Sequence, residues 1–145
     1  MMMAFSYQIF PVGFVRKKDQ TTKIEIQKKF GAALLGLDQF SHIHVIYWFH
    51  ENDIPEQRSI LQVYPRNDKR NPLTGVFATH SPARPNLIAL TICRVVAIRE
   101  NVIEIDRIDA NDGTPVIDIK SYNPNNEAKP PFRIPEWVRI GNESC

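Results

Sequence analysis

The sequence is poor in cysteine, in long apolar runs and in net charge. Its 145 residues include two cysteines, Cys93 in an apolar run and Cys145 at the end, without a Cys-x-x-Cys pair. We therefore expect no disulfide bridge, no zinc site and a reduced, cytoplasmic protein. No apolar run approaches the roughly 20 residues of a membrane helix, and residues 1–10 lack the basic leader of an export signal. The formal net charge of +2 permits a nucleic-acid partner but does not indicate one.

Alternating strands and helices are also missing, as is the Gly-x-Gly-x-x-Gly turn of dinucleotide-binding folds. What is present is a series of short strand patterns separated by turns. A segment from Gln27 carries Phe30, Ala33, Leu34 and Leu37 at helical spacing, with Gly36 as its stop. The predicted strands cover residues 7–15, 24–26, 43–48, 60–64, 75–79, 88–98, 101–108 and 116–119.

These patterns predict a mostly β fold, a small antiparallel β-barrel with one main helix. Turns are expected at residues 19–22, after a basic cluster at residues 16–18, and at Glu100-Asn101. We interpret the basic cluster as a solvated strand end. A single domain is expected over residues 1–145, with a Pro- and Asn-rich tail at 126–145. Four apolar residues are expected to pack this tail on the barrel: Phe132, Ile134, Trp137 and Val138.

Three histidines lie on an aromatic segment, residues 40–50. Even spacing places His42, His44 and His50 on one strand face in principle. No carboxylate or cysteine accompanies them at metal-ligand spacing, and Trp48 shares the face, so we predict no metal site. We expect His42 to satisfy a backbone group in the core, and His50 to be free to meet a ligand.

Residues 75–86 form an unusual loop. Pro82 and Pro85 restrict the backbone on both sides of Arg84, and Asn86 follows. A rigid guanidinium beside an amide suits recognition of a planar polar ligand. The alternative is that the prolines only turn the chain and Arg84 is solvated.

A Ser-His-Asp hydrolase is disfavoured by the context of the serines. Neither Ser41 nor Ser81 lies in a Gly-x-Ser-x-Gly elbow. Adjacent residues on a strand point to opposite faces, so His80 is poorly placed to activate Ser81.

Residues 112–122 begin with an Asp-Gly turn whose backbone can approach a ligand closely. Asp118 and Lys120, two residues apart on a strand, share a face and can line one pocket. The alternative is an ordinary turn followed by a surface ion pair, which contributes little.

Several blocks in order resemble the TrmO (TsaA-like) family. They are Val12-Gly13-Phe14-Val15-Arg16, Gly36-Leu37-Asp38-Gln39-Phe40-Ser41-His42, Trp48-Phe49-His50, Gly75-Val76-Phe77-Ala78-Thr79, Arg84-Pro85-Asn86 and Asp112-Gly113-Thr114-Pro115-Val116-Ile117-Asp118-Ile119-Lys120. Family members are S-adenosylmethionine-dependent methyltransferases that act on N6 of threonylcarbamoyladenosine beside the tRNA anticodon. The resemblance implies a β-barrel homodimer with tRNA as substrate and the cofactor near the subunit interface.

The resemblance also implies site residues. The implied cofactor-binding residues are His50, Glu51, His80, Leu90, Asp112, Gly113, Thr114 and Pro115. The implied substrate-binding residues are Arg84, Asn86, Lys120 and Tyr122. The chain departs from the family at His80, where arginine is usual, and at Leu87, Ala89, Thr91 and Ser121. The Pro-Arg-Gln stretch and the extra C-terminal domain of longer members are absent from this sequence.

Methylation of the urea-like N6 nitrogen requires a proton acceptor, and Asp112 and Asp118 are the candidate general bases. Two alternatives remain open. The His80 departure favours a non-enzymatic dimeric module that binds S-adenosylmethionine or a nucleotide. A plain RNA-binding barrel would use exposed aromatics in a basic groove, for which the best candidate stretch is Tyr64, Arg66, Lys69 and Arg70.

Overall fold

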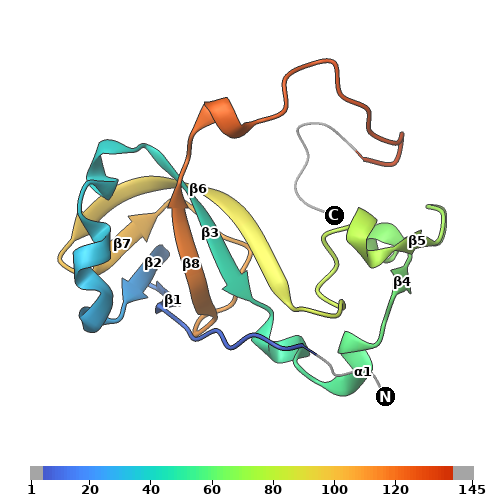
Figure 1. The fold of residues 1–145 in the computed structure, drawn as a ribbon, viewed down its shortest axis with the longest axis horizontal. Helices are drawn as coiled ribbons and strands as arrows, with labels where there is room; N and C mark the ends of the chain where they lie inside the picture. Colours follow the sequence, from blue (N-terminus) through green and yellow to red (C-terminus); the bar gives the residue numbers. More distant parts are fainter. Residues whose placement is uncertain (1–4, 139–145) are drawn as a thin grey trace. The chain divides into compact units, whose positions relative to one another are not determined.

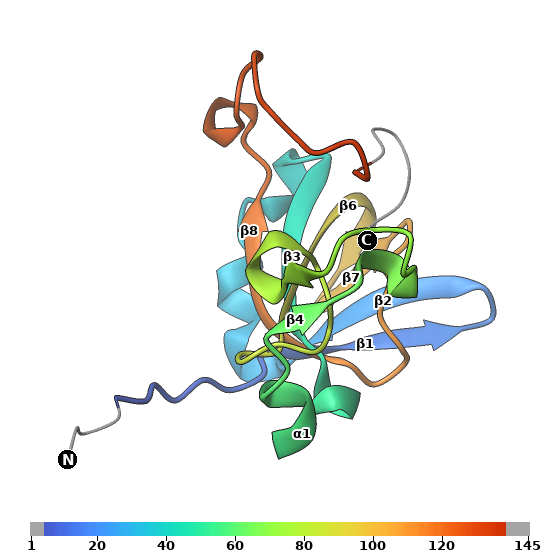
Figure 2. The ribbon, with the colours of Figure 1, turned by 90° about the vertical axis from the view of Figure 1, so that its right-hand side faces the viewer.

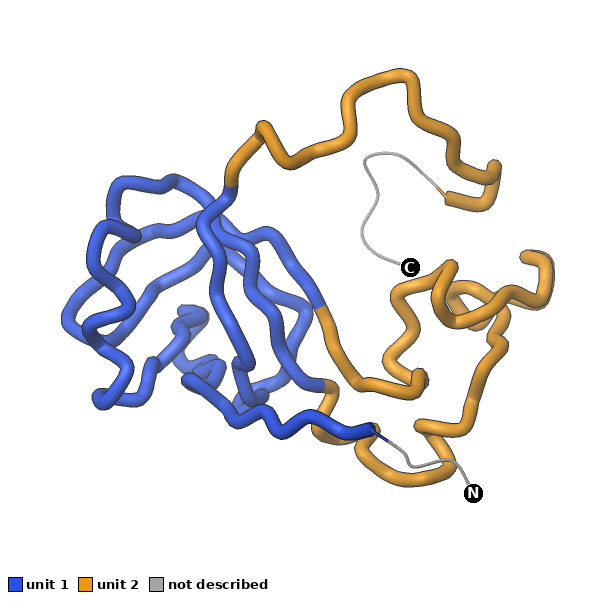
Figure 3. Tube along the Cα trace, in the orientation of Figure 1, with its two compact units in different colours: residues 1–48, 90–122 blue, residues 49–89, 123–145 orange. Residues whose placement is uncertain are grey.

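The computed structural model describes residues 5–138. The chain divides into two compact units (Figure 3). The first comprises Met1–Trp48 and Leu90–Tyr122, and the second comprises Phe49–Ala89 and Asn123–Cys145. Within the described part of the chain, no helix has the length and apolar character needed to cross a membrane.

Six strands close into a barrel in the order β1-β2-β7-β6-β3-β8 (Figure 1). Their registered pairings are antiparallel. The fold is therefore the small antiparallel barrel that the strand patterns predict. The strands are β1 (Gly13–Lys18), β2 (Thr21–Ile26), β3 (His42–Trp48), β6 (Ile88–Arg99), β7 (Val102–Ile105) and β8 (Pro115–Ser121).

The barrel interior is built from alternate residues of these strands. In β3, Ile43, Val45 and Tyr47 are buried, while the residues between them are partly exposed. Each fully buried aliphatic side chain contributes roughly 1.5–3 kcal/mol of hydrophobic free energy. The predicted alternation of this strand is confirmed. The other fully buried members of the barrel core are Val15, Ile24, Cys93, Ile103 and Val116.

Both predicted turns are present, although the first covers only Asp19 and Gln20, since β2 already begins at Thr21. β1 and β2 form a hairpin (Figure 2) whose two turn residues, Asp19 and Gln20, have positive φ values of 53° and 62°. Paired positive φ values match the right-handed twist of the flanking strands. Glu100, with φ of 54°, turns the chain between β6 and β7.

The helical prediction is correct in place but wrong in type. Lys28–Leu34 is a 3-10 helix, η1, without a side-chain cap and without a buried residue. Gly31 lies at its centre, where glycine disfavours a longer α-helix. A second 3-10 turn, η2 (Leu37–Gln39), follows Gly36, whose φ of 87° ends the first helix as predicted.

Four strand predictions extend too far: those at residues 7–15, 60–64, 75–79 and 101–108. β1 begins at Gly13 because Pro11 has no N–H to donate, and Phe10 stacks instead on Phe30 with ring centroids 5.8 Å apart. β7 ends at Ile105, where the Asp106 carboxylate replaces a main-chain acceptor for the Arg94 N–H.

The third correction concerns residues 75–79. Only Thr74–Gly75 is a strand, β5, and Val76–Ala78 forms the 3-10 turn η5. The Thr79 hydroxyl and the Thr79 N–H both donate to the Val76 carbonyl, which closes this turn.

The second unit contains little regular structure. β5 pairs with β4 (Gln62–Val63), a two-residue remnant of the strand predicted at residues 60–64. Its helices are η3 (His50–Asn52), α1 (Pro55–Arg58), η4 (Pro65–Asn67), η5 and η6 (Pro124–Asn126). In the tail, Phe132 and Ile134 are exposed. The single domain and the packing of the tail on the barrel remain predictions.

The Cys93 thiol is free and fully buried. Burial raises the pKa of this thiol to about 12, which keeps it protonated and chemically inert at neutral pH. Cys145 lies outside the described residues.

Gly13 lies where β1 meets both β2 and β8, opposite Ile26 of β2 and Val116 of β8. The registered pairs of the β1–β8 seam are Gly13 with Val116 and Phe14 with Pro115. A Cβ atom on Gly13 would lie 2.5 Å from the Glu25 carbonyl oxygen and 3.0 Å from the Ile26 Cα. Backbone atoms of a neighbouring strand cannot give way cheaply, so this position requires glycine.

We expect Gly13→Ala to destabilise the protein by about 1–3 kcal/mol, because the added methyl group forces β1 away from β2. The matched control is Gly31→Ala, since a Cβ there would meet no atom within 4 Å. Urea denaturation followed by circular dichroism measures both. Equal stability of the two variants would contradict this account of the β1–β2 contact at Gly13.

Candidate cofactor and substrate site

The turn at residues 112–115 is fixed to β1 by main-chain and side-chain hydrogen bonds. The Gly113 N–H donates to the Val15 carbonyl at 2.7 Å, and the Val15 N–H donates to the Thr114 carbonyl at 2.9 Å. The Lys17 N–H donates to Asp112 Oδ1 at 2.8 Å. The Lys17 ammonium group donates to the Ile108 carbonyl at 2.9 Å. β1 therefore holds the turn in one conformation.

This turn has the features of a binding element. Gly113 adopts φ of 86°, and a Cβ on it would meet no atom within 4 Å, so the space beside its backbone is open. Asp112 is exposed, and only one of its carboxylate oxygens is used within the described chain. Thr114 is buried, and its N–H donates to the Asn111 carbonyl within the turn. An adenosine-type ligand with amino and hydroxyl groups fits an exposed carboxylate beside open backbone.

The outer surface of β8 carries three of the expected site residues. Asp118 pairs with Ile46 of β3 and Lys120 pairs with His44, so both lie on the outward face. The Tyr122 ring lies 5.6 Å from the His44 ring and 6.0 Å from the His42 ring, measured between centroids. Asp118 and Lys120 thus share a face, as their spacing indicates, together with two histidines and a tyrosine.

This outer face lies away from the turn. Pro115 begins β8, and Lys120 follows five residues later, which corresponds to roughly 17 Å along a strand. Leu90, another expected cofactor residue, is 55% exposed on the outward side of β6. In the first unit, the expected cofactor residues 112–115 therefore form one turn, and the expected substrate residues Lys120 and Tyr122 lie at the other end of β8.

The histidine predictions require correction. His42 is not a core residue, because β3 directs Ile43 inward and His42 outward. His50 does not continue the row, since it lies beyond the end of β3 in η3. Among residues 5–138, no group of three or more His, Cys, Asp or Glu side chains is arranged to hold a metal ion.

One serine–histidine pair does form. Ser41 Oγ and His42 Nδ1 lie 2.7 Å apart, although neighbouring residues on a strand usually point apart. The His42 imidazole also contacts the Tyr122 ring, and no carboxylate in the described chain orients the His42 imidazole. The pair therefore lacks the third member of a hydrolase triad.

In the second unit, Arg84 folds back onto its own loop. Its Nη1 atom donates to the carbonyls of Thr79 and Ser81, each at 3.1 Å. These two carbonyls flank His80, which is exposed. Arg84 is therefore neither solvated nor wholly available to a ligand: it fixes the backbone that presents His80.

Two hydrogen bonds connect this loop with the segment after β3. The Phe49 N–H donates to the Leu87 carbonyl at 2.8 Å, and Arg58 Nη1 donates to the Pro85 carbonyl at 3.0 Å. Arg58 also contacts Asp53 at 2.8 Å through Nε. The expected site residues of this unit therefore lie on two segments tied to each other: His50 and Glu51 on one, His80, Arg84 and Asn86 on the other.

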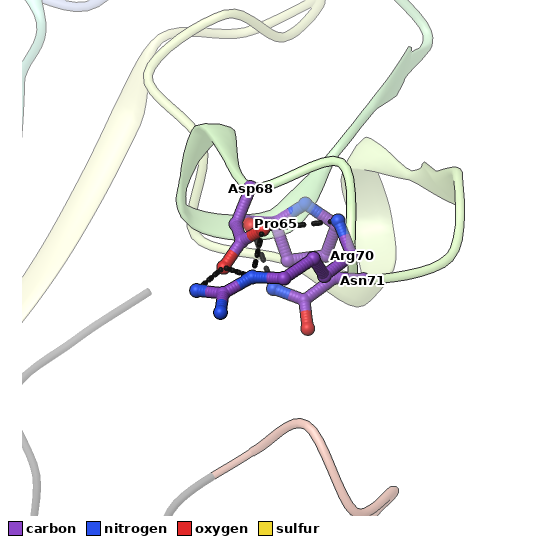
Figure 4. Close-up of polar contacts among 4 residues, drawn as sticks. All are labelled: Pro65, Asp68, Arg70 and Asn71. Carbon is purple, nitrogen blue, oxygen red and sulfur yellow. Dashed lines mark hydrogen bonds and ion pairs between the residues drawn. The ribbon is translucent and has the colours of Figure 1, made fainter.

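The basic loop at residues 65–71 is held by its own contacts (Figure 4). The Arg70 guanidinium donates to both carboxylate oxygens of Asp68, with a shortest distance of 2.7 Å, and the Asn71 side chain donates to the Pro65 carbonyl. Asp68 thus offsets the charge of Arg70. This loop has less free positive charge than its composition indicates.

The sequence patterns did not reveal the roles of Lys17 and Arg58. The sequence pattern places Lys17 in a solvated basic cluster, whereas in the structure its main-chain N–H donates to Asp112, 95 positions away. No local spacing signals a contact that depends on the pairing of β1 with β8. Arg58, one residue past a Pro-Glu-Gln helix start, gave no motif at all.

The fold and these loops define the class of protein: a small closed β-barrel without a Rossmann core. The tRNA-methyltransferase O N-terminal domain model matches residues 8–128. The chain belongs to this family.

Curated relatives agree with this assignment. A probable S-adenosyl-L-methionine-binding protein of Methanocaldococcus jannaschii is 45% identical over 81% of this chain and 93% of its own length. A protein of the same description from Pyrococcus horikoshii is 48% identical, with 81% and 83% covered. The human tRNA (adenine(37)-N6)-methyltransferase is 38% identical over 68% of this chain, which corresponds to 23% of that enzyme.

Solved structures have the same fold. The crystal structure of TrmO from Pseudomonas aeruginosa superposes with a TM-score of 0.71 at 25% identity, covering 94% of this chain. The match spans 64% of that enzyme. The present chain thus corresponds to a part of the longer enzymes and to most of the archaeal proteins.

We expect Arg84→Ala to release the 79–86 loop. The variant removes the hydrogen bonds from the guanidinium to the Thr79 and Ser81 carbonyls, and a hydrogen bond to a charged group contributes about 1.5–3 kcal/mol. Backbone hydrogen exchange at Ser81 and Ala83 is then expected to accelerate by about tenfold or more. Arg66→Ala serves as the control, since Arg66 is exposed and lies outside the 79–86 loop. Unchanged exchange in Arg84→Ala would show that the prolines alone fix the loop.

Proposed function

We propose that this chain binds S-adenosylmethionine and transfers its methyl group to N6 of threonylcarbamoyladenosine beside the anticodon of tRNA. The observation that carries the proposal is the pinned 112–115 turn, whose family-matching residues present a carboxylate and open backbone together. The archaeal relatives described as S-adenosyl-L-methionine-binding and the mammalian tRNA (adenine(37)-N6)-methyltransferases support it. Such an enzyme works where tRNA is modified, which we take to be the cytoplasm.

The chain's own residues would hold the cofactor through polar and apolar contacts. Asp112 has a free carboxylate oxygen for hydroxyl or ammonium groups, and the Gly113 backbone leaves room for close approach. Leu90 offers an exposed apolar side chain of the kind that packs on an adenine ring. When bound, S-adenosylmethionine supplies an electrophilic methyl group on a sulfonium sulfur.

The acceptor nitrogen loses a proton on methylation, and a carboxylate is the proposed acceptor of that proton. Asp112 lies in the turn itself and retains one oxygen beyond its bond to Lys17. Asp118 lies on the outward face of β8, where its Oδ1 accepts from the Ile119 N–H. Positioning of the acceptor in line with the sulfur–methyl bond supplies much of the rate in such transfers.

A homodimer is the proposed working form. Ile88, Leu90 and Ile92 are 46%, 55% and 47% exposed, and their even spacing places them in one row on β6. An apolar row on a barrel strand is typical of a surface that a second copy covers.

A non-enzymatic module that binds S-adenosylmethionine is the second candidate. It is favoured by His80, because a histidine lacks the permanent charge and bidentate fork of the arginine usual in the family.

We expect the protein to bind S-adenosylmethionine with about one site per subunit, measured by calorimetric titration. Asp112→Ala should weaken binding at least about tenfold, because one carboxylate both pins the turn and faces the ligand. Asp38→Ala, an exposed aspartate on η2, is the matched control with unchanged affinity. An absence of wild-type binding at millimolar cofactor would overturn the proposal.

The acceptor is tested with the same preparation and methyl-labelled S-adenosylmethionine. Label is expected in tRNA that carries threonylcarbamoyladenosine and not in tRNA from cells that lack this modification. Label in both would refute the proposed acceptor. Cofactor binding without transfer to either tRNA would establish the non-enzymatic module instead.

For the dimer, we expect Ile92→Glu to produce monomers in sedimentation equilibrium, because it places a charge in the apolar row. Leu35→Glu is the control, since Leu35 is 95% exposed outside that row. A wild-type monomer, or dissociation by both variants alike, would contradict the proposed interface.

A further inference from the structure

The β1–β2 hairpin places like charges directly opposite each other. Its register pairs Arg16 with Lys23, and Lys18 lies two residues beyond Arg16 on the same outward face. All three side chains are exposed. Directly opposed like charges on neighbouring strands are destabilising, so this arrangement does not serve the fold.

Nearby acids do not neutralise these three residues. Within residues 5–138, no ion pair within 4.0 Å involves Arg16, Lys18 or Lys23. Glu104 lies across from Lys23 on β7, but its carboxylate faces Arg99 at 3.9 Å. The three side chains therefore keep their charged groups out of close ion pairs, although Glu25 lies on the same outward face.

One of these cations is held in place by an aromatic ring. The Arg16 guanidinium carbon lies 5.3 Å from the centroid of the Phe14 ring. This contact reduces the freedom of the guanidinium, while its edge donors are left for a ligand. A guanidinium of this kind is well suited to a phosphate group.

The charged surface borders the proposed cofactor turn. An open hollow of about 610 Å³ is lined by the hairpin, including Arg16, Lys18 and Lys23, and by Asp112. Asp19, Glu25 and Lys17 also line it, and the Lys17 ammonium group donates to the Ile108 carbonyl. The bond from Lys17 to Asp112 fixes the hairpin to the turn.

We propose that the outward face of the hairpin, formed by Arg16, Lys18 and Lys23, binds the phosphate backbone of the RNA substrate beside the 112–115 turn. The inference rests on the proposed function, since it supplies the surface on which that substrate is held. Phosphates of neighbouring nucleotides would each meet one cation, because residues two apart on a strand are separated by roughly 7 Å, while the base to be methylated reaches the turn. Such contacts are independent of sequence and sensitive to salt.

The test is tRNA binding by the full-length triple variant Arg16→Gln, Lys18→Gln and Lys23→Gln, measured by fluorescence anisotropy at several salt concentrations. Each lost phosphate contact reduces the steepness of log affinity against log salt by about 0.7–0.9, so the three substitutions should together reduce it by about 2–3. At moderate salt the affinity should fall by about tenfold to a hundredfold. Calorimetric affinity for S-adenosylmethionine should not change.

A second triple variant removes the same charge elsewhere: Lys28→Gln, Lys129→Gln and Arg133→Gln, three exposed residues outside the hairpin. It should retain wild-type RNA affinity. Equal losses in both variants would show that only net charge matters, and would overturn the inference. Lys18→Gln alone is a milder change that tests the inference even if the triple variant misfolds. It should reduce the steepness of log affinity against log salt by about 0.7–0.9.

Failure of this inference and failure of the proposed function give different results. If the wild type binds and methylates tRNA while the hairpin variant binds it equally well, the inference is wrong and the proposed function stands. If the wild type binds no tRNA at any salt concentration, both are wrong.

Discussion

Closure of the barrel between β1 and β8 is the constraint on which the rest of the first unit depends. The strands share two registered pairs, and the 112–115 turn lengthens the seam through its bonds to Val15 and Lys17. Gly13 permits the close approach of β1 to β2 that brings β1 into this position. The same hydrogen bonds that close the barrel therefore fix the element proposed to hold the cofactor, so fold and site share their main-chain contacts.

In the barrel, inward side chains stabilise the fold and outward side chains determine the chemistry of the surface. Inward residues such as Ile24 and Val45 are fully buried and supply stability. Outward residues differ from strand to strand: the hairpin is basic, β6 is apolar, and the β3–β8 surface carries histidines and Tyr122. Because strand neighbours alternate between the two faces, outward positions can change chemistry with little effect on the core.

The sequence predicted those features that depend on local pattern. The alternation of β3, the hairpin turn at Glu100 and the helix stop at Gly36 follow from period and backbone preference. The failures are features that depend on tertiary contacts or on competing side-chain bonds. The Thr79 hydroxyl converts a strand pattern into a 3-10 turn. Arg84 has a motif that indicates a ligand, yet its guanidinium holds the carbonyls beside His80.

The absence of a long helix in the described residues bears on the proposed chemistry. η1, with seven residues, offers no helix N-terminus of the kind that binds a pyrophosphate. S-adenosylmethionine has no phosphate and carries positive charge on its sulfonium and amino groups, so a carboxylate such as Asp112 suits it better. RNA is an anion and suits Arg16 and Lys23. Cofactor and substrate of opposite charge would then use neighbouring elements, and the Lys17–Asp112 hydrogen bond joins those elements. The proposed pairing of a cationic methyl donor with an anionic acceptor strand would thus follow from how this barrel closes.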